Sequence, residues 1–271
     1  MIREQLRNLK SGPSLLNLGK VVLHKEECGP IFSNLSLSLT TKAIPMSLLC
    51  LVAATLPETE PLRSALEWMQ IAPGHFQTHA WGYDLELIHT GIGMVNTAWS
   101  LAAWSSKKTR FDLGINLGIA GAYDPDLALG QVVEIIEDSF AEMGADSPEG
   151  FLSLDELGFP LLTTSTGPSY NTLRNPEPFG QGLTQVWGLT VNQVQGTAAG
   201  IQQMRSRWGA EVESMEGAAF FYAMLRIGKP FAAFRAVSNY VEPRDRSRWK
   251  IGLAVKEVNE YLLQTLSEKR W

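Results

Sequence analysis

From about residue 46 onward, short apolar runs alternate with stretches whose apolar residues recur every three or four positions. A short, nearly continuous apolar run is typical of a buried strand, and the longer period is typical of an amphipathic helix. The runs predict strands at 48–55, 76–80, 83–89, 113–117, 132–138, 189–192, 212–214 and 231–237. The periodic stretches predict helices at 61–69, 94–104, 196–208, 217–227 and from 245 onward, around a Pro- and Gly-rich middle that ends near residue 183. This alternation predicts an α/β fold with a largely parallel sheet.

Residues 1–45 show no such period and contain Ser-Gly-Pro at 11–13 and Cys-Gly-Pro at 28–30. We expect a poorly ordered N-terminal extension, followed by one domain at 46–271. Met46 stands directly before the first strand, which raises the alternative that translation naturally starts there. Residues 44–55 have the apolar length of a signal-peptide core, but they lie far inside the chain, so a buried strand is favoured.

The composition narrows the class of protein. The chain has 271 residues, 23 basic against 28 acidic side chains and a formal charge of −5 without a basic block, which disfavours a nucleic-acid partner. Its two cysteines, Cys28 and Cys50, are too few for a disulfide framework and fit a reducing cytoplasm. No apolar run reaches the roughly 18 residues of a membrane helix. We therefore expect a cytoplasmic protein without a membrane partner.

Common cofactor, metal and hydrolase motifs are weak or missing. Thr-Gly-Ile-Gly at 90–93 follows a strand and opens a helix, but a dinucleotide fingerprint would need Gly or Ala where Asn96 stands, and there is no Walker loop. His75 and His79 are four residues apart, yet their local pattern is that of a strand and no Glu completes a metal motif. A Gly-x-Ser-x-Gly elbow is missing as well. We predict neither a metal nor a cofactor.

Candidate chemistry lies where predicted strands end, because ligands of open α/β sheets bind at the carboxyl ends of strands. The helix-start amides after Thr90 and Gly91 favour an anion or a ribose oxygen, or form only a tight turn. The small residues of 116–121 would let a flat ring or a sugar lie against the backbone. Glu58 or Glu60, after the first strand, can act as a general base on water or remain a solvated carboxylate.

Two further segments carry candidate ligands of a nucleoside. Glu216 precedes Gly-Ala-Ala at a helix start, where its carboxylate can accept from two ribose hydroxyls or merely complement the helix dipole. Ser238 and Asn239 follow the last strand. The Asn239 amide can donate to a ring carbonyl and accept from a ring N–H, which matches a 6-oxopurine edge, or it can simply form a turn.

Together these segments resemble the purine nucleoside phosphorylase and nucleosidase superfamily over residues 47–265. The resemblance lies in six segments: Ala-Thr-Leu-Pro-Glu at 54–58, Thr-Gly-Ile-Gly at 90–93, Asn-Leu-Gly-Ile-Ala-Gly at 116–121, Phe-Ala-Glu-Met-Gly-Ala at 140–145, Ser-Met-Glu-Gly-Ala-Ala at 214–219, and Arg235 to Arg246. The Met-Glu-Gly-Ala pattern marks the superfamily. The run Ser-Asn-Tyr-Val-Glu-Pro-Arg-Asp-Arg at 238–246 is more specific and is most similar to futalosine hydrolases. The resemblance implies a three-layer α/β/α phosphorylase-like fold around a mixed, largely parallel sheet.

The resemblance also implies roles for individual residues. Glu58 matches the acid that activates water, and Asn239 stands where adenine-specific nucleosidases carry an Asp that protonates the leaving base. The implied substrate-binding residues are Thr90, Gly91, Val191, Thr197, Met215, Glu216, Ser238 and Arg244, with 191–197 lining the base pocket. That segment lacks the family's usual Asp and aromatic residue, so it does not identify the group that stacks on the base.

Asn at position 239, where adenine-specific nucleosidases carry Asp, has a physical explanation. An ionised Asp would repel the 6-carbonyl of hypoxanthine, whereas an amide offers it a donor, and a wrong polar partner costs on the order of 10⁴ in rate. The resemblance thus implies hydrolysis of futalosine to hypoxanthine and dehypoxanthine futalosine in menaquinone biosynthesis, by a homo-oligomer. The Arg244–Arg246 pair would face the benzoate carboxylate, or form a solvated loop. Open alternatives are another purine nucleosidase, a phosphorylase and a non-catalytic nucleoside-binding protein.

Overall fold

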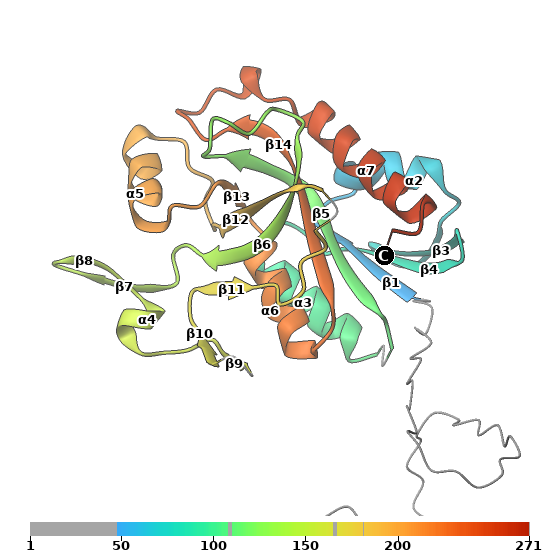
Figure 1. Ribbon diagram of the computed structural model, residues 1–271, viewed down its shortest axis with the longest axis horizontal. Helices are drawn as coiled ribbons and strands as arrows, with labels where there is room; N and C mark the ends of the chain where they lie inside the picture. Colours follow the sequence, from blue (N-terminus) through green and yellow to red (C-terminus); the bar gives the residue numbers. More distant parts are fainter. Residues whose placement is uncertain (1–47, 108–109, 165–166, 181, 271) are drawn as a thin grey trace, which may run out of the picture. The chain divides into compact units, whose positions relative to one another are not determined.

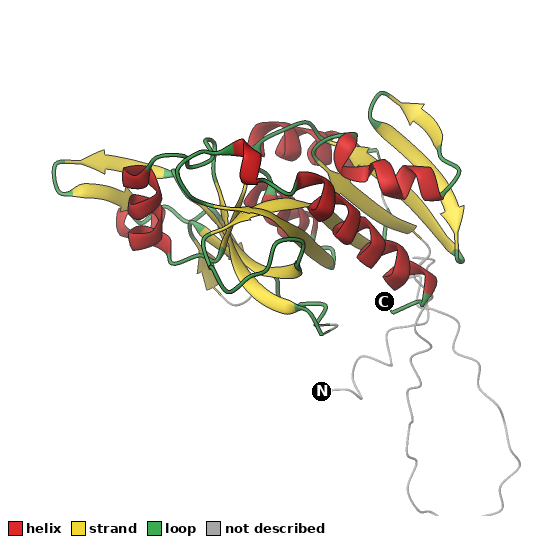
Figure 2. Ribbon diagram, turned by 90° about the horizontal axis from the view of Figure 1, so that it is seen from above, coloured by secondary structure: helices red, strands yellow, loops and turns green. Residues whose placement is uncertain are grey.

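The computed structural model describes residues 48–270 except 108–109, 165–166 and 181 (Figure 1). The extension expected at 1–45 therefore lies outside the described residues. In the described part, ten strands form one mixed sheet with helices on both faces, which confirms the predicted three-layer α/β/α fold (Figures 1 and 2).

The centre of the sheet consists of four parallel strands in the order β4–β1–β5–β14. Their bounds are β1 (Leu48–Ala53), β4 (Tyr83–His89), β5 (Leu113–Ala122) and β14 (Phe231–Tyr240). Almost every side chain of β1 and β14 is buried, as expected of strands that are covered by helices on both faces. This is why their sequences are nearly continuous apolar runs.

A second set of strands closes one end of the sheet into a ring. It consists of β6 (Val132–Phe140), β12 (Thr184–Thr190) and β13 (Val212–Ser214). β12 runs parallel to β6 and to β13, whereas β13 is antiparallel to β5 and β14 is antiparallel to β6. The successive pairs β5–β14–β6–β12–β13–β5 therefore form a closed ring. At the edges the antiparallel strands are β2 (Met69–Ala72), β3 (His75–Ala80) and β11 (Thr172–Arg174).

Helices α3 (Met94–Ser105) and α6 (Gly217–Ile227) cover one face, and α2 (Glu60–Ala65) and α7 (Ile251–Ser267) cover the other (Figure 1). On α7 the buried positions include Ala254, Val258 and Leu262, the stripe predicted from the sequence. Helix α5 (Ala198–Trp208) packs beside the ends of β12 and β13. Two short 3₁₀ helices are η1 (Pro57–Thr59) and η2 (Arg246–Arg248).

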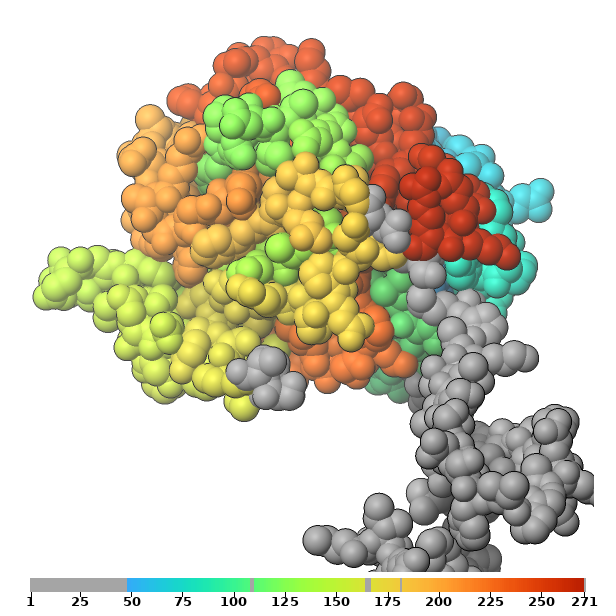
Figure 3. Space-filling view, in the orientation of Figure 1, coloured from blue at the N-terminus to red at the C-terminus, as the bar shows by residue number. Residues whose placement is uncertain are grey.

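The middle segment predicted as loop contains several short elements. They are β7 (Gly144–Ser147), β8 (Gly150–Ser153), α4 (Leu154–Leu157), β9 (Leu162–Thr164) and β10 (Gly167–Ser169). Each spans three or four residues, which is too short for a period to show in the sequence. The β7–β8 hairpin projects from the rest of the domain (Figures 1 and 3).

Several predicted boundaries are corrected by the structure. The helix expected at 61–69 ends at Ala65, and Met69 begins β2 instead. The predicted hairpin at 76–89 is confirmed, with positive φ at Trp81 and Gly82 in its two-residue turn. Strand β5 continues to Ala122, so the glycines of 116–121 lie inside a strand and not in a turn after it. The last helix begins at Ile251, after η2, and not at 245.

Candidate active site

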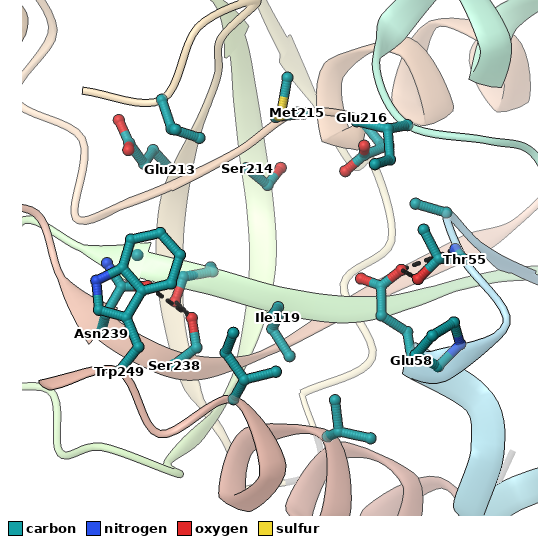
Figure 4. Close-up of a pocket in the computed structure, with 18 of the residues that line it drawn as sticks. Thr55, Glu58, Ile119, Glu213, Ser214, Met215, Glu216, Ser238, Asn239 and Trp249 are labelled. Carbon is teal, nitrogen blue, oxygen red and sulfur yellow. Dashed lines mark hydrogen bonds between the residues drawn. The ribbon is translucent and has the colours of Figure 1, made fainter. Parts of the chain in front are cut away.

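A cavity of about 380 Å³ opens where β1, β5, β13 and β14 end (Figure 4). Its volume lies in the range of small-molecule sites. Three carboxylates from two segments line it, Glu58 after β1 and both Glu213 and Glu216 in the stretch from β13 to α6. Ser238 and Asn239 line it from β14, and Ile251 and Val255 from α7. The cavity therefore combines several acids with an apolar wall.

Glu58 lies at the end of β1, in the first 3₁₀ turn after the strand. Its Oε2 accepts two hydrogen bonds from Thr55, from the backbone N–H and from the hydroxyl, both at 2.8 Å (Figure 4). A Cβ built on Gly118 would lie 3.1 Å from Glu58 Oε1, so the glycine lets the carboxylate approach the middle of β5. Glu58 is thus held from one side and faces the cavity with its other oxygen.

Glu216 is the residue before α6 and lies across the cavity from Glu58 (Figure 4). Its Oε1 accepts from the backbone N–H of Gly93 at 2.8 Å, at the start of α3. The anion that was expected at this helix start is therefore the carboxylate of Glu216 itself. Burial raises the Glu216 pKa, and the Gly93 hydrogen bond and the Arg235 charge oppose that shift. Met215, the preceding residue, also lines the cavity.

A buried charge cluster lies beneath these two acids. Arg235 on β14 is 2% exposed and donates to the backbone oxygen of Phe234 at 3.0 Å and to the side-chain oxygen of Asn116. Burial lowers its pKa, while Glu216, Asp138 and Glu58 favour its charged form. The single guanidinium therefore acts on both carboxylates that face each other across the cavity.

Asp138 on β6 is the fully enclosed member of the cluster. Its Oδ1 accepts from the Thr190 hydroxyl at 2.6 Å, and that hydroxyl accepts from the backbone N–H of Ala218 at 2.7 Å. A Cβ on Gly217 would lie 1.9 Å from Asp138 Oδ2, so the first residue of α6 must be glycine to admit the carboxylate. Burial raises the Asp138 pKa to about 7, against the opposing effects of Thr190 and Arg235. Asp138 thereby fixes the first turn of α6 directly behind Glu216.

Ser238 and Asn239 both face the cavity although neighbouring strand residues normally point to opposite faces. The register of β14 against β5 shifts between Val237 and Asn239, which inserts one residue and turns both side chains to the same side. The Ser238 hydroxyl donates to Asn239 Oδ1 at 2.7 Å, and Asn239 Nδ2 donates to the Tyr240 carbonyl at 3.0 Å. An amide nitrogen carries two N–H groups, so Asn239 retains one donor for a ligand.

Glu213 on β13 is an acid at the cavity wall to which the sequence analysis assigned no role. The Tyr123 hydroxyl donates to its Oε2 at 2.6 Å, and the backbone N–H of Gln195 donates to its Oε1 at 3.2 Å. Burial raises its pKa to about 7 against the opposing effect of both hydrogen bonds, and the neighbouring Glu142 carboxylate adds a smaller upward effect. The hydrophobic pattern of the predicted strand at 212–214 did not indicate that Glu213 faces a ligand site.

Trp249 is an aromatic side chain of the cavity wall that no sequence pattern indicated. It follows η2, and the guanidinium of Arg244 lies 5.0 Å from its ring centroid. Arg244 lines the cavity too, and its backbone N–H donates to the Gly196 carbonyl at 3.1 Å. The loop after β14 is thus tied to the loop before α5 at the cavity rim.

The family model of the phosphorylase superfamily matches residues 49–267. The chain belongs to the phosphorylase superfamily. Among its relatives, a futalosine hydrolase of Thermus thermophilus is 34% identical over 194 residues, which are 69% of this chain and 84% of that protein. A futalosine hydrolase of Acidothermus cellulolyticus is 31% identical over 214 residues, 77% of this chain and 86% of that protein. These findings confirm the resemblance read from the sequence.

Solved structures of two nucleoside hydrolases share the fold. A methylthioadenosine/S-adenosylhomocysteine nucleosidase of Neisseria meningitidis superposes with a TM-score of 0.67 at 19% identity, over 82% of this chain and all of that chain. A futalosine hydrolase mutant of Helicobacter pylori gives 0.68 at 13% identity, over 82% of this chain and 99% of that chain. At these identities the structures support the fold alone.

Within this superfamily fold, four predicted substrate-binding residues do not lie on the cavity wall. Thr90 is buried, with its hydroxyl 2.9 Å from the Gly91 carbonyl, and Gly91 forms the turn at φ 88°. Val191 lies in the apolar cluster under α5, and Thr197 caps that helix through a hydrogen bond from the Gly200 N–H. Their segments do reach the cavity, through other residues: Ile92 in the first case, and Val194 and Gln195 in the second.

Two other features are missing from the described part of the chain. No group of three or more potential metal ligands occurs among those residues. No helix there is long and apolar enough to cross a membrane.

Proposed function

We propose that this protein hydrolyses the N-glycosidic bond of futalosine and releases hypoxanthine and dehypoxanthine futalosine. The observation that carries the proposal is one cavity in which Glu58 and Glu216 face each other and Asn239 stands at the far end (Figure 4). The identity of 31–34% to several futalosine hydrolases supports this substrate.

In the proposed reaction the C–N bond lengthens and the ribose gains oxocarbenium character. Glu216 accepts hydrogen bonds from the ribose hydroxyls and stabilises the positive charge that develops on the sugar. Glu58, held by Thr55, takes a proton from water as the water attacks the anomeric carbon. Arg235, beneath the two carboxylates, supplies a positive charge that acts on both.

The base end of the cavity is proposed to select a 6-oxopurine. Asn239 has one N–H beyond its bond to Tyr240, and this donor fits the carbonyl of hypoxanthine. The amino group at position 6 of adenine would present a second donor to it. Since a buried donor without an acceptor loses most of its solvation free energy, adenine nucleosides should be poor substrates.

Water is proposed as the nucleophile in preference to phosphate. Among the described residues that line the cavity, Arg244 alone carries a full positive charge, and it lies at the rim beside Trp249. A phosphate subsite would need cationic or backbone donors next to the anomeric carbon, where Glu58 stands.

The deciding experiment is hypoxanthine release, followed by chromatography. The purified chain is incubated with futalosine, inosine and methylthioadenosine, each with and without phosphate. Phosphate-independent release from futalosine alone is the expected result. Release only with phosphate would make the protein a phosphorylase, adenine from methylthioadenosine would contradict the role of Asn239, and binding without turnover would indicate a nucleoside-binding protein.

Arg244 is proposed to pair with the benzoate carboxylate of futalosine. Arg244 is an exposed residue of the cavity lining, and its guanidinium lies 5.0 Å from the centroid of the Trp249 ring, which places a cation beside an aromatic wall of the cavity. Arg244→Ala should raise the KM for futalosine and leave that for inosine unchanged. Arg248→Ala is the matched control, because Arg248 pairs with Glu242 at 2.7 Å. An unchanged KM for futalosine in the first variant would remove this role.

The remaining expectations are proposals about context. We propose that residues 46–271 suffice for catalysis, that the protein acts in menaquinone biosynthesis in the cytoplasm, and that it is a homo-oligomer. Exposed apolar side chains on α3, among them Trp99 at 74% exposure, support self-association. The first point is tested by comparing the turnover rate of a chain shortened to residues 46–271 with that of the full chain, which should be equal. The oligomeric state is tested by comparing the mass in solution of Trp99→Glu, which should be lower, with that of the wild type.

A further inference from the structure

The proposed reaction requires a proton at the leaving base, and Asn239 cannot supply it. An amide donates a hydrogen bond, but its N–H is far too weak an acid to transfer its proton near neutral pH. As the glycosidic bond breaks, its electron pair passes to the purine. A purine leaves more easily as a neutral molecule than as an anion, so an acid at the base end of the cavity would lower the barrier.

Glu213 is the acid at that end. Of the described carboxyl groups that line the cavity, Glu58 and Glu216 lie on the sugar side, and Glu213 lies on the side of Asn239 (Figure 4). Glu213 and Asn239 flank the same glycine: a Cβ on Gly121 would lie 3.1 Å from Asn239 Nδ2 and 3.5 Å from Glu213 Cγ. The glycine thus brings an amide and a carboxyl group to one edge of the cavity.

The Glu213 carboxyl group is held in place without being saturated. Tyr123 donates to one oxygen and the Gln195 N–H to the other, which leaves each oxygen a further lone pair or a proton. The charged and titratable groups that act on it are Tyr123 from the end of β5 and Glu142 from the loop after β6; Arg205 of α5 acts through Tyr123. The residue is 5% exposed, and burial with the Glu142 charge raises its pKa to about 7. Its acid form is therefore available at neutral pH.

We propose that Glu213, in its carboxylic acid form, protonates the purine nitrogen of the leaving base while Asn239 binds the adjacent carbonyl. The inference rests on the proposed function and identifies the acid of that same reaction. The C–N bond breaks with its electrons moving to the purine, and the Glu213 O–H proton passes to the ring. Water forms the new C–O bond, and its proton passes to Glu58. Solvent then returns a proton to Glu213 and removes one from Glu58, so that one water is consumed per cycle.

The test compares Glu213→Gln with the matched variant Glu142→Gln. Glu142 also accepts a backbone N–H of the same loop, from Asn192 at 3.1 Å, but it does not line the cavity. We expect kcat for futalosine to fall about 10²- to 10⁴-fold in Glu213→Gln with KM changed by less than about threefold. On the low-pH plateau of the rate profile, Glu142→Gln should keep kcat within about threefold of the wild type, although the loss of its charge should move the decline above that plateau to lower pH. An active wild type with an unaffected Glu213→Gln variant would overturn this inference alone, whereas an inactive wild type would overturn the proposed function.

A second measurement separates proton donation from a merely structural role. The wild-type kcat should decline above about pH 7, because Glu213 then ionises. Tyr123→Phe removes a hydrogen bond that favours the ionised form, so it should move this decline to higher pH. On 4-nitrophenyl riboside, whose leaving group needs no proton, Glu213→Gln should match the wild type to within about threefold. An unmoved pH profile in Tyr123→Phe, or an equal loss on both substrates in Glu213→Gln, would contradict proton donation.

Discussion

Asp138→Asn tests how the buried charge cluster beneath the cavity is maintained. The Asp138 carboxyl group is 1% exposed, and its pKa is raised from 3.8 to about 7 in the folded protein. Asn has nearly the same shape and can still accept from the Thr190 hydroxyl. The substitution therefore removes the titration and leaves most of the packing.

The direction of the effect follows from proton linkage. Between about pH 4 and pH 7 the folded protein keeps a proton on Asp138 that the unfolded chain has lost, so the wild type loses stability as the pH rises through that window. A shift of about three units at about 1.4 kcal/mol per unit amounts to on the order of 4 kcal/mol. The free energy of unfolding of Asp138→Asn, relative to the wild type, should rise by up to that amount from pH 4 to pH 7 and remain constant above it.

The assay is urea unfolding of both proteins at four or more pH values between 4 and 8, analysed as the difference between them so that other titrating groups cancel. Asp245→Asn is the control, because Asp245 is exposed and hydrogen bonds from Ser247 lower its pKa. Any small pH-dependent change in its free energy of unfolding relative to the wild type should have the opposite sign to that of Asp138→Asn. A difference between Asp138→Asn and wild type that stays constant over this pH range would refute the reasoning.

Other predictions address the chemistry and the packing of the site. Glu58→Gln should lower kcat for hypoxanthine release by about 10²- to 10⁴-fold with little change in KM, and the same substitution at exposed Glu60 should have no effect on either constant. Asn239→Asp should lower kcat/KM for futalosine by up to about 10⁴-fold, since a carboxylate would face the purine carbonyl; an unchanged value in steady-state assays would argue against base recognition by this residue. Gly217→Ala should abolish soluble expression or strongly lower the melting temperature, because its Cβ would lie 1.9 Å from a buried carboxylate oxygen. Gly252→Ala, in an open position of α7, should instead be neutral or stabilise by up to about 1 kcal/mol in thermal unfolding.

The site could be predicted in part because some of its residues lie in short local patterns. Glu58, Met215, Glu216, Ser238, Asn239 and Arg244 were all read from the sequence and all line the cavity. Each lies at or just beyond the end of a strand, where an α/β sheet places its ligands. Thr90, Gly91, Val191 and Thr197 lie in equally suggestive segments, but they support turns, the core and a helix cap. A pattern of residues identifies the segment near a ligand and not which of its side chains reaches it.

The sequence by itself determined the alternation of the main strands and helices and the segments that carry the acids, because period and strand-end chemistry are local properties. The three-layer fold followed from the resemblance of those segments to a known superfamily, and the short elements such as β2 and β7 to β11 were not predicted. Only the tertiary structure decided which side chains meet. The register shift in β14 turns Ser238 and Asn239 to the same side. Gly121 leaves room for Glu213 beside Asn239, although Glu213 lies about 90 residues further along the chain than Gly121. Val255 reaches the wall because α7 packs over the sheet, and Trp249 reaches it from the end of η2, just before that helix. Such meetings depend on long-range register and packing, which no local pattern of hydrophobic and polar residues encodes.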